Sequence, residues 1–384
     1  MNGKPRRVLV VDHAGVLGGA ELSLLDLLGA FGPETGAVLF DEGPFREELS
    51  RRGVAVHVHR LGASALVRKQ TIVPSPAAIV DTIRAARKLA HHARAFDLLY
   101  ANSQKAFVVS VIAGWLSGRA VVWHLRDILG PPHFGVANVR AAIWLANRGA
   151  RVVIANSKAT ADAFVAAGGR AHLVHVVHNG IDPAPFDGIS DADAAQLRRS
   201  LGTQPGAPLI VHVGRFHPWK GQQVLLRAIA LEPRAQAWIV GAPLFGEEAF
   251  AAELDALARE LGVASRVNFL GFRRDVPALL KAADIVVHSS TWPEPFGRVV
   301  VEGMLAGRPV IATRGGGVGE LVTDGETALV VNPGDPGTLA AAIARLIDDG
   351  ALARSLANRG AAHARARFSR DAMVRGVAEL LSAV

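Results

Sequence analysis

Short apolar runs alternate with helical stretches along the whole chain of 384 residues, and this alternation restricts its fold more than any other feature. The first half opens with RVLVVD at 7–12, then a glycine-bearing loop and a helical pattern at 21–31. Further strand-like runs follow at 36–40, 54–57, 98–100, 120–123 and 152–155. Strands that alternate with helices pair in parallel, so the pattern predicts a doubly wound sheet.

The second half repeats this plan. Its strand-like runs lie at 209–213, 237–240, 267–270, 285–289, 309–313 and 328–331. Between the halves, Asn179, Gly180 and two nearby prolines mark a turn and a linker. We therefore expect an α/β protein with two similar domains and a crevice between them.

Charge is divided unevenly between the two halves. Residues 1–182 carry 21 Lys+Arg and 13 Asp+Glu, whereas residues 183–384 carry 21 of each. The positive excess of +8 therefore lies in the first half, which favours an anionic partner there. A basic nucleic-acid-binding module is one alternative, but the chain has one tyrosine and no RNA or DNA motif.

Several classes of site are excluded by residue types and spacings. The chain has no cysteine, which removes disulfides, thiolate metal sites and cysteine nucleophiles. No histidine pair has zinc-ligand spacing, and no dinucleotide, Walker or serine-hydrolase motif occurs, so we expect no metal and no bound cofactor. The longest apolar stretch, 106–116, is too short to span a membrane, and the first apolar run is too short for a signal peptide. We expect a cytoplasmic protein.

The strongest candidate site lies in the segment 289–322. Glu294 lies on a loop stiffened by two prolines after a predicted strand, and Glu302 lies on the helix that Gly297 begins. The free amides at the start of that helix, from Gly297 to Val299, favour an anion. Two carboxylates flanking a phosphate-binding helix end suit a nucleotide sugar. The alternative is a helix-capping Glu294 and a surface Glu302.

A second candidate site is the loop HVGRFHPWKG at 212–221, directly after a predicted strand. Pro218 is expected to keep this loop from being helical. Arg215 and Lys220 can then both point at one diphosphate, Arg as a fork and Lys as a point charge. The alternative is a pair of solvated surface cations.

The first half contributes weaker candidates. Gly18 and Gly19 lie where the first loop meets the first helix, and glycine lets the backbone approach a ligand closely. Glu21 suits the start of that helix electrostatically. His124 ends a predicted strand and could hydrogen-bond a sugar hydroxyl or a reacting group. A tight turn and a structural histidine are the alternatives.

Together these residues resemble the retaining glycosyltransferases of family four, also called glycosyl transferases group 1, which have the GT-B architecture of two facing Rossmann-like domains. The resemblance is carried by GGAE (18–21), His124, VVHNGID (176–182), VGRFHPWKG (213–221), FLGF (269–272) and EPFGRVVVEGMLAGRPVIATRGGGVGEL (294–321). It implies an acceptor-side domain at 1–180 and a donor-binding domain at 181–368. It also implies a C-terminal helix at 369–384 that packs back towards the first domain.

The resemblance also implies roles for single residues. Arg215 and Lys220 would hold the donor diphosphate, and Glu302 the ribose. Glu294 would contact the transferred sugar, and His124 would bind that sugar from the opposite domain. Further donor contacts would come from Gly18, Gly19, Phe296, Gly297, Arg298, Val299 and the turn Gly271, Phe272 and Arg273, which would receive the base.

Two positions depart from the family's pattern. Arg298 stands where the family often has an apolar residue, and this leaves the donor sugar open. Gly319 stands before Glu320, where the family often has proline, and makes this loop more flexible.

The resemblance implies a metal-independent enzyme that transfers a sugar, with retention, from a nucleoside diphosphate sugar of uridine or guanosine type to an acceptor hydroxyl. Glycan, glycolipid or natural-product glycoside biosynthesis would use such an enzyme. The alternative is a nucleotide-sugar epimerase on the same double-domain plan.

The acceptor is expected to be lipid-linked or otherwise anionic, because the basic residues gather in the first half. A helix is predicted at 79–96, with Ile79, Ile83, Ala86 and Ala90 along one side. Its remaining surface carries Arg84, Arg87, Lys88, His91 and Arg94, and Arg68 and Lys69 lie in a nearby loop. This face is either simply solvated or docks on the anionic inner surface of the membrane.

Overall fold

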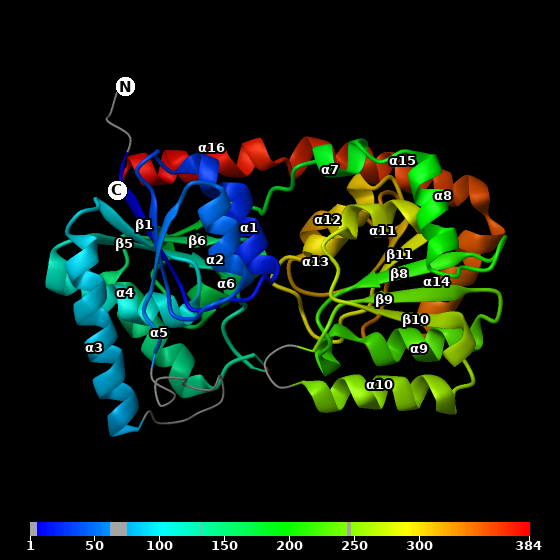
Figure 1. The fold of residues 1–384 in the computed structure, drawn as a ribbon, viewed down its shortest axis with the longest axis horizontal. Helices are drawn as coiled ribbons and strands as arrows, with labels where there is room; N and C mark the ends of the chain where they lie inside the picture. The colour runs from blue at the N-terminus through cyan, green and yellow to red at the C-terminus, as the bar shows by residue number, and fades with distance from the viewer. Residues whose placement is uncertain (1–5, 62–74, 132, 244–246) are drawn as a thin grey trace. The chain divides into compact units, whose positions relative to one another are not determined.

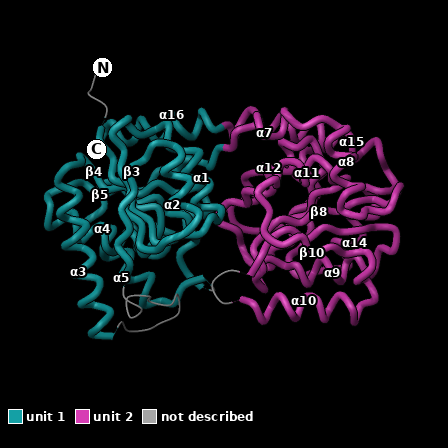
Figure 2. Tube along the Cα trace, viewed as in Figure 1, with its two compact units in different colours: residues 1–180, 370–384 teal, residues 181–369 magenta. Residues whose placement is uncertain are grey.

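The structure is a computed structural model that describes residues 6–61, 75–131, 133–243 and 247–384 (Figure 1). Two compact units divide the chain (Figure 2). Unit 1 contains residues 1–180 and 370–384, and unit 2 contains residues 181–369. The predicted Arg68 and Lys69 lie outside the described residues.

Unit 1 is built on a seven-stranded parallel sheet with the order β3-β2-β1-β4-β5-β6-β7. Its strands are β1 (Val8–Asp12), β2 (Gly36–Leu39), β3 (Ala55–Val58), β4 (Leu98–Ala101), β5 (Ala120–Leu125), β6 (Val152–Ala155) and β7 (Val174–Val176). Its helices are α1 (Gly19–Leu27), η1 (Leu28–Ala30), α2 (Pro44–Arg51), α3 (Pro76–Ala93), α4 (Gln104–Ser117), α5 (Val136–Gly149), α6 (Lys158–Ala166), η3 (Ala171–Leu173) and α16 (Arg370–Ser382). The short strand β7 pairs with β6 but has no apolar run, so the sequence pattern does not predict it.

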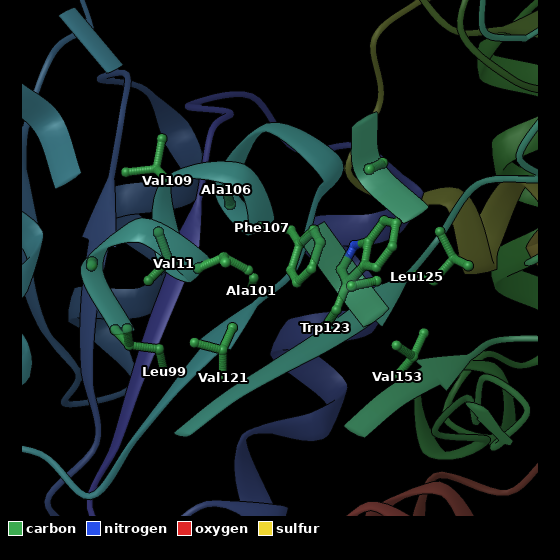
Figure 3. Close-up of a cluster of buried hydrophobic side chains, with 14 of the residues drawn as sticks. Val11, Leu99, Ala101, Ala106, Phe107, Val109, Val121, Trp123, Leu125 and Val153 are labelled. Carbon is green, nitrogen blue, oxygen red and sulfur yellow. The ribbon is translucent and has the colours of Figure 1, made fainter. Parts of the chain in front are cut away.

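The helices of unit 1 pack on its sheet through two apolar clusters. In one cluster, shown in Figure 3, the ring of Phe107 on α4 stacks on Trp123 of β5 with centroids 4.2 Å apart. On the same face α4 contacts both α3 and α5. The other cluster joins Val8 and Leu24 to Met373 and Val377 of α16, which also contacts α1 and η1. The last helix of the chain thus completes the core of unit 1.

The buried side of α3 differs from the predicted one. Small residues and one leucine face the core: Ala78, Ala85, Ala86, Leu89, Ala90 and Ala93. Ile79 and Ile83, predicted to share the apolar side, are 48% and 37% exposed. The residues that cover α3, chiefly on α4, reach Ala86 and Ala90 but leave these two isoleucines uncovered.

Unit 2 is built on a six-stranded parallel sheet with the order β10-β9-β8-β11-β12-β13. Its strands are β8 (Leu209–Val213), β9 (Gln236–Val240), β10 (Val267–Gly271), β11 (Ile285–His288), β12 (Val310–Thr313) and β13 (Leu329–Val331). Its helices are α7 (Ala184–Asp187), α8 (Asp191–Ser200), η4 (Pro218–Lys220), α9 (Gln222–Leu231), α10 (Glu248–Glu260), η5 (Ala264–Arg266), α11 (Val276–Ala282), α12 (Arg298–Leu305), α13 (Val318–Leu321), α14 (Pro336–Asp348) and α15 (Gly350–Arg367).

Both sheets are therefore Rossmann-like, and the predicted α/β class is confirmed. In each sheet the strand order reverses once, at β1/β4 in unit 1 and at β8/β11 in unit 2. Ligands of such sheets bind outside the carboxyl ends of the strands at this reversal. The residues that follow these four strands are therefore the first place to look for a site.

Candidate functional site

Lys220 and Glu294 meet at the strand reversal of unit 2. Lys220 ends the 3-10 turn η4 after β8, and Glu294 lies on the loop after the neighbouring strand β11. The Lys220 Nζ lies 2.5 Å from Glu294 Oε1. The expectation that Pro218 excludes helix here is wrong, because proline is tolerated in the first helical turn, where its missing N–H has no partner to lose.

Three side chains donate hydrogen bonds to Glu294, which is buried. Besides Lys220, Ser290 Oγ donates to Oε1 at 2.7 Å, and His288 Nε2 lies 3.3 Å from the same oxygen. Burial opposes ionisation of Glu294, but the charge of Lys220 and the contact with His288 outweigh it and hold the pKa well below its usual range. Glu294 is therefore an ionised carboxylate at neutral pH.

A second layer of buried polar residues supports this carboxylate. Thr313 donates to the carbonyl oxygen of Ser290 at 2.8 Å, and its hydroxyl oxygen lies 3.2 Å from His288 Nδ1. His212 of β8 donates from Nε2 to the carbonyl oxygen of Lys220 at 3.3 Å. Burial is the main cause that lowers the pKa of His212 to about 4, so this ring is neutral. The ends of three strands thus position the Lys220–Glu294 pair.

Two cations flank one indole ring beside the pair. The Lys220 ammonium lies 4.1 Å from the centroid of Trp219, and the Arg215 guanidinium lies 5.9 Å from it. A cation over an indole face is attracted by the ring's quadrupole, so Trp219 helps to hold both side chains at the strand end. The two predicted diphosphate ligands are therefore brought together.

Glycines allow three loops to touch at this sheet edge. Gly316 has φ +60°, and a Cβ added there would lie 2.1 Å from the carbonyl oxygen of Glu294. Gly221 has φ +75°, and its Cβ would lie 1.8 Å from the carbonyl oxygen of Ser289. Any side chain at either position would push the loops apart. The GGG segment at 315–317 thus fixes the backbone of the Glu294 loop.

The predicted phosphate-binding helix is α12. It begins at Arg298 after Gly297, and Arg298 Nε donates to Glu302 Oε1 at 2.7 Å. Glu302 is thus paired on its own helix and is not a free surface carboxylate. Phe296 is buried and its ring packs on Phe368, so only its backbone could contact a donor. Val299 is also partly buried against the core.

The turn predicted to receive the base follows β10. Its Phe272 side chain is 53% exposed. Arg273 forms two hydrogen bonds with Asp275, at 2.8 and 2.6 Å, which fix its guanidinium along the turn. Gly271 accepts a hydrogen bond from Gly241 N at 2.9 Å, which ties the turn to the end of β9.

At the strand reversal of unit 1, Gly18 and Gly19 open α1. The Gly18 N–H donates to Glu21 Oε2 at 2.9 Å, closing a capping interaction at the helix start. Burial raises the pKa of Glu21 to about 7, and the nearby charge of Asp12 adds to this effect. Glu21 is therefore partly protonated at neutral pH.

A buried polar network that sequence reasoning missed surrounds this helix start. Asn102 Nδ2 donates to Asp12 Oδ2 at 2.6 Å, and Arg126 Nε donates to Asn102 Oδ1 at 3.0 Å. Arg126 also donates to Asn179 Oδ1 at 2.8 Å. Asp12, Asn102 and Arg126 each directly follow or end an apolar run, and that placement is the signal that could have found them.

His124 lies in β5 and is fully buried. Its Nδ1 hydrogen-bonds with the hydroxyl of Tyr100, while its Nε2 has no hydrogen-bond partner in the part of the chain that the structure describes. Burial, with the charge of Arg126, holds the pKa of His124 well below its usual range. The ring is therefore neutral, and its Nε2 is buried without a partner among the described residues.

No group of three His, Asp or Glu side chains within residues 6–61, 75–131, 133–243 and 247–384 has the arrangement needed to hold a metal ion. Within the same ranges, no helix is long and apolar enough to cross a membrane.

Comparison with known proteins places the chain in a family. The model of glycosyl transferases group 1 matches residues 193–363, and that of glycosyltransferase family 4 matches residues 45–185. The crystal structure of HepE from Anabaena in complex with UDP-glucose is 39% identical, with a TM-score of 0.90, over 99% of this chain and all of HepE. The chain belongs to glycosyltransferase family 4. The predicted family is therefore confirmed, and with it the GT-B fold class.

Curated relatives match over shorter stretches. The lipopolysaccharide core biosynthesis glycosyltransferase LpsE of Rhizobium meliloti is 37% identical over 185 residues, which cover 48% of this chain and 53% of LpsE. A D-inositol 3-phosphate glycosyltransferase of Mycobacterium sp. strain KMS is 37% identical over 46% of this chain and 40% of its own length. The chain thus spans about half the length of the curated relatives it matches.

Proposed function

We propose that this member of the family is a retaining glycosyltransferase that moves a sugar from a nucleoside diphosphate sugar to an acceptor hydroxyl in glycan biosynthesis. The observation that carries the proposal is the Lys220–Glu294 pair, with Arg215 beside it, at the strand reversal of unit 2. HepE, which is 39% identical over its whole chain, was solved with UDP-glucose. A uridine diphosphate sugar is therefore the donor we propose.

Lys220 and Arg215 would stabilise the leaving diphosphate. Negative charge grows on the diphosphate as the glycosidic bond breaks, and preorganised cations stabilise that charge without a metal ion. Lys220 already contacts a carboxylate, so the ammonium would bridge Glu294 and the phosphate. The first amides of α12, beside Gly297 and Arg298, add a dipole of the same sign.

Glu294 would accept hydrogen bonds from hydroxyls of the transferred sugar. Its low pKa excludes a general-acid role at neutral pH, because the carboxyl carries no proton to donate. We do not assign it as a nucleophile. The acceptor would attack from the face that the diphosphate leaves, and the departing phosphate would take the acceptor proton. This path gives retention.

The remaining roles extend the proposal to the donor's other parts. Glu302 would accept from the ribose hydroxyls, and the turn at 271–273 would receive the base. His124 Nε2 would hydrogen-bond the transferred sugar. Residues 1–180 would then form the acceptor-side domain and residues 181–368 the donor-binding domain.

The partner of unit 1 would be an anionic acceptor or the anionic inner surface of the membrane. On α3, the exposed Ile79 and Ile83 lie on the same helix as the exposed Arg84, Arg87 and Lys88. Basic residues next to exposed apolar ones favour peripheral binding to anionic lipid, each cation near the surface adding about 1 kcal/mol.

A donor panel tests the activity. The full chain is incubated with UDP-glucose, UDP-galactose, UDP-N-acetylglucosamine and GDP-mannose, and released nucleoside diphosphate and sugar products are measured by mass. We expect slow release from a uridine donor that survives EDTA and falls at least tenfold in Lys220→Met. The exposed Arg259→Met serves as the charge-matched control. Interconversion of the donor sugars would instead indicate an epimerase. Loss of activity with EDTA would contradict the proposal that Arg215 and Lys220 stabilise the diphosphate without a metal ion.

A further inference from the structure

Four histidines gather at the edge of the sheet of unit 1, outside the residues assigned to sugar transfer. His57 lies on the edge strand β3 and His59 directly follows it, while His91 and His92 lie on the last turn of α3. The ring of His92 lies 4.6 Å from that of His57 and 4.9 Å from that of His59, centroid to centroid. Two segments more than 30 residues apart in the sequence therefore form one cluster.

A hollow of about 530 Å³ opens beside these rings. We call it the imidazole pocket, and its lining residues are His59, Arg87, Lys88, His91 and His92. A volume of this size accommodates a phosphate-bearing group, since small-molecule sites range from about 300 to 1,000 Å³. Each of these five described side chains is cationic or becomes so on protonation.

The charged groups that act on His59 and His92 are all basic. Burial is the main cause that lowers the pKa of both rings. His92, Lys88 and His57 add to this effect at His59, and His57 and His91 add to it at His92. The carboxylate that lies on α3, Asp81, pairs with Arg84 one turn away from the pocket.

The pocket also contains an imidazole nitrogen with nothing to bind. His59 Nδ1 is buried and has no hydrogen-bond partner in the part of the chain that the structure describes. A buried polar atom without a partner costs free energy, so this ring is not held in place by a hydrogen bond at Nδ1. One guanidinium, one ammonium and three imidazoles provide more donors than one carboxylate accepts. A phosphate with two negative charges and three terminal oxygens can use them all.

We propose that the imidazole pocket binds a phosphomonoester group. The inference deepens the proposed anionic partner of unit 1 and rests on it, because it names the chemical group recognised and the side chains that hold it. Phosphomonoesters can come from a lipid headgroup or from a soluble compound. The apolar residues Ile79, Val80 and Ile83 are exposed about one to two turns before Arg87 on α3, where a lipid chain would lie next to the headgroup.

The phosphate arm of the test uses the full chain labelled with ¹³C at histidine Cε1, titrated at pH 7.5 with inorganic phosphate, which is chiefly the dianion at this pH. We expect saturable shifts of His59 and His92, and an apparent Kd at least tenfold weaker in the double variant Arg87→Ala, Lys88→Ala. Arg84→Ala removes one charge from the same helix outside the pocket and should change the Kd less than twofold. Both arginines and the lysine are exposed, so these variants should keep their fold.

The lipid arm compares phosphatidylcholine vesicles that contain phosphatidic acid, a monoester, with vesicles that contain phosphatidylglycerol, a diester, at matched surface charge. Preference for phosphatidic acid that the double variant loses assigns a lipid ligand. Phosphate binding without that preference assigns a soluble phosphomonoester. Absence of saturable histidine shifts, or shifts equal in wild type and double variant, overturns the proposal. Nucleoside diphosphate release by the same variants is measured separately, so failure of the pocket is distinguished from failure of the transferase.

Discussion

The Lys220–Glu294 pair allows a prediction whose magnitude follows from its surroundings. The Lys220 Nζ lies 2.5 Å from Glu294 Oε1, and the two side chains are 22% and 7% exposed to solvent, respectively. Exposed ion pairs contribute about 0–1 kcal/mol, while breaking a fully buried pair costs about 3–5 kcal/mol. Lys220 is partly exposed, and Ser290 and His288 would still donate to an unpaired Glu294. We therefore expect a coupling free energy of about 2 kcal/mol.

The perturbation is a double-mutant cycle of Lys220→Met, Glu294→Gln and the double variant. Methionine keeps the apolar stem that packs near Trp219 and removes only the charge. For a unit of this size, 1 kcal/mol corresponds to about 2–4 °C in Tm, so Lys220→Met should lower the Tm of unit 2 by about 4–8 °C in calorimetry. The double variant should recover part of this loss, because no uncompensated carboxylate remains.

The control is a pair of similar length on the surface. Arg259 and Asp255 pair at 2.6 Å, with side chains 64% and 54% exposed. The same double-mutant cycle on this pair should give a coupling free energy of less than about 0.5 kcal/mol. Equal coupling in the two cycles would refute the argument that burial sets the strength of the Lys220–Glu294 pair.

The pH dependence supplies a second check on the same pair. The folded state holds the pKa of Glu294 below its unfolded value, so the pair's stabilisation is present above about pH 4.3 and is lost as the pH falls through the folded pKa. The Tm difference between wild type and Lys220→Met should thus be constant from pH 6 to 8 and shrink below about pH 4.3.

Three further predictions address other residues. Arg215→Lys replaces a planar guanidinium, which can donate two parallel hydrogen bonds to a phosphate, by a compact ammonium. Turnover, measured as released nucleoside diphosphate, should fall by on the order of tenfold, and the Tm should not change. Gly316→Ala places a Cβ 2.1 Å from a carbonyl oxygen at φ +60° and should destabilise unit 2 by about 3 kcal/mol, seen as a lower Tm. Glu21 has its folded pKa raised to about 7, so wild type loses stability as the pH rises from about 4.3 to 7, and the Tm advantage of Glu21→Gln should grow over that range.

The strands could be predicted from the sequence because most of them are buried on both faces and so appear as continuous apolar runs. The run at 209–213 coincides with β8. β7 was not predicted because its residues at 174–176 are exposed or half-buried and alternate valine with histidine. On α3, periodicity placed Ile79 and Ala86 on one side but did not show where the neighbouring helix stops covering that side.

The residue types of the site could also be predicted, but not their pairing. Lys220 and Glu294 are 74 residues apart, and only the order β8-β11 brings their loops together. His288 and Ser290 were missed although His288 ends β11 and Ser290 lies two residues beyond it, where polar residues after an apolar run indicate a functional edge. The imidazole pocket was missed because His59 and His92 are 33 apart and share no motif.

The two units show how one topology gives two unlike sites. Both sheets reverse their strand order at the same point, and both place a buried glutamate beside it, Glu21 in unit 1 and Glu294 in unit 2. Burial raises the pKa of each, but the nearest charge differs: Asp12 adds to the rise for Glu21, whereas Lys220 reverses it for Glu294. At neutral pH the first is partly protonated and the second fully ionised. The chemistry at each reversal is therefore set by which charged residue lies near the glutamate, Asp12 at the end of β1 or Lys220 after β8, and not by the fold that positions it.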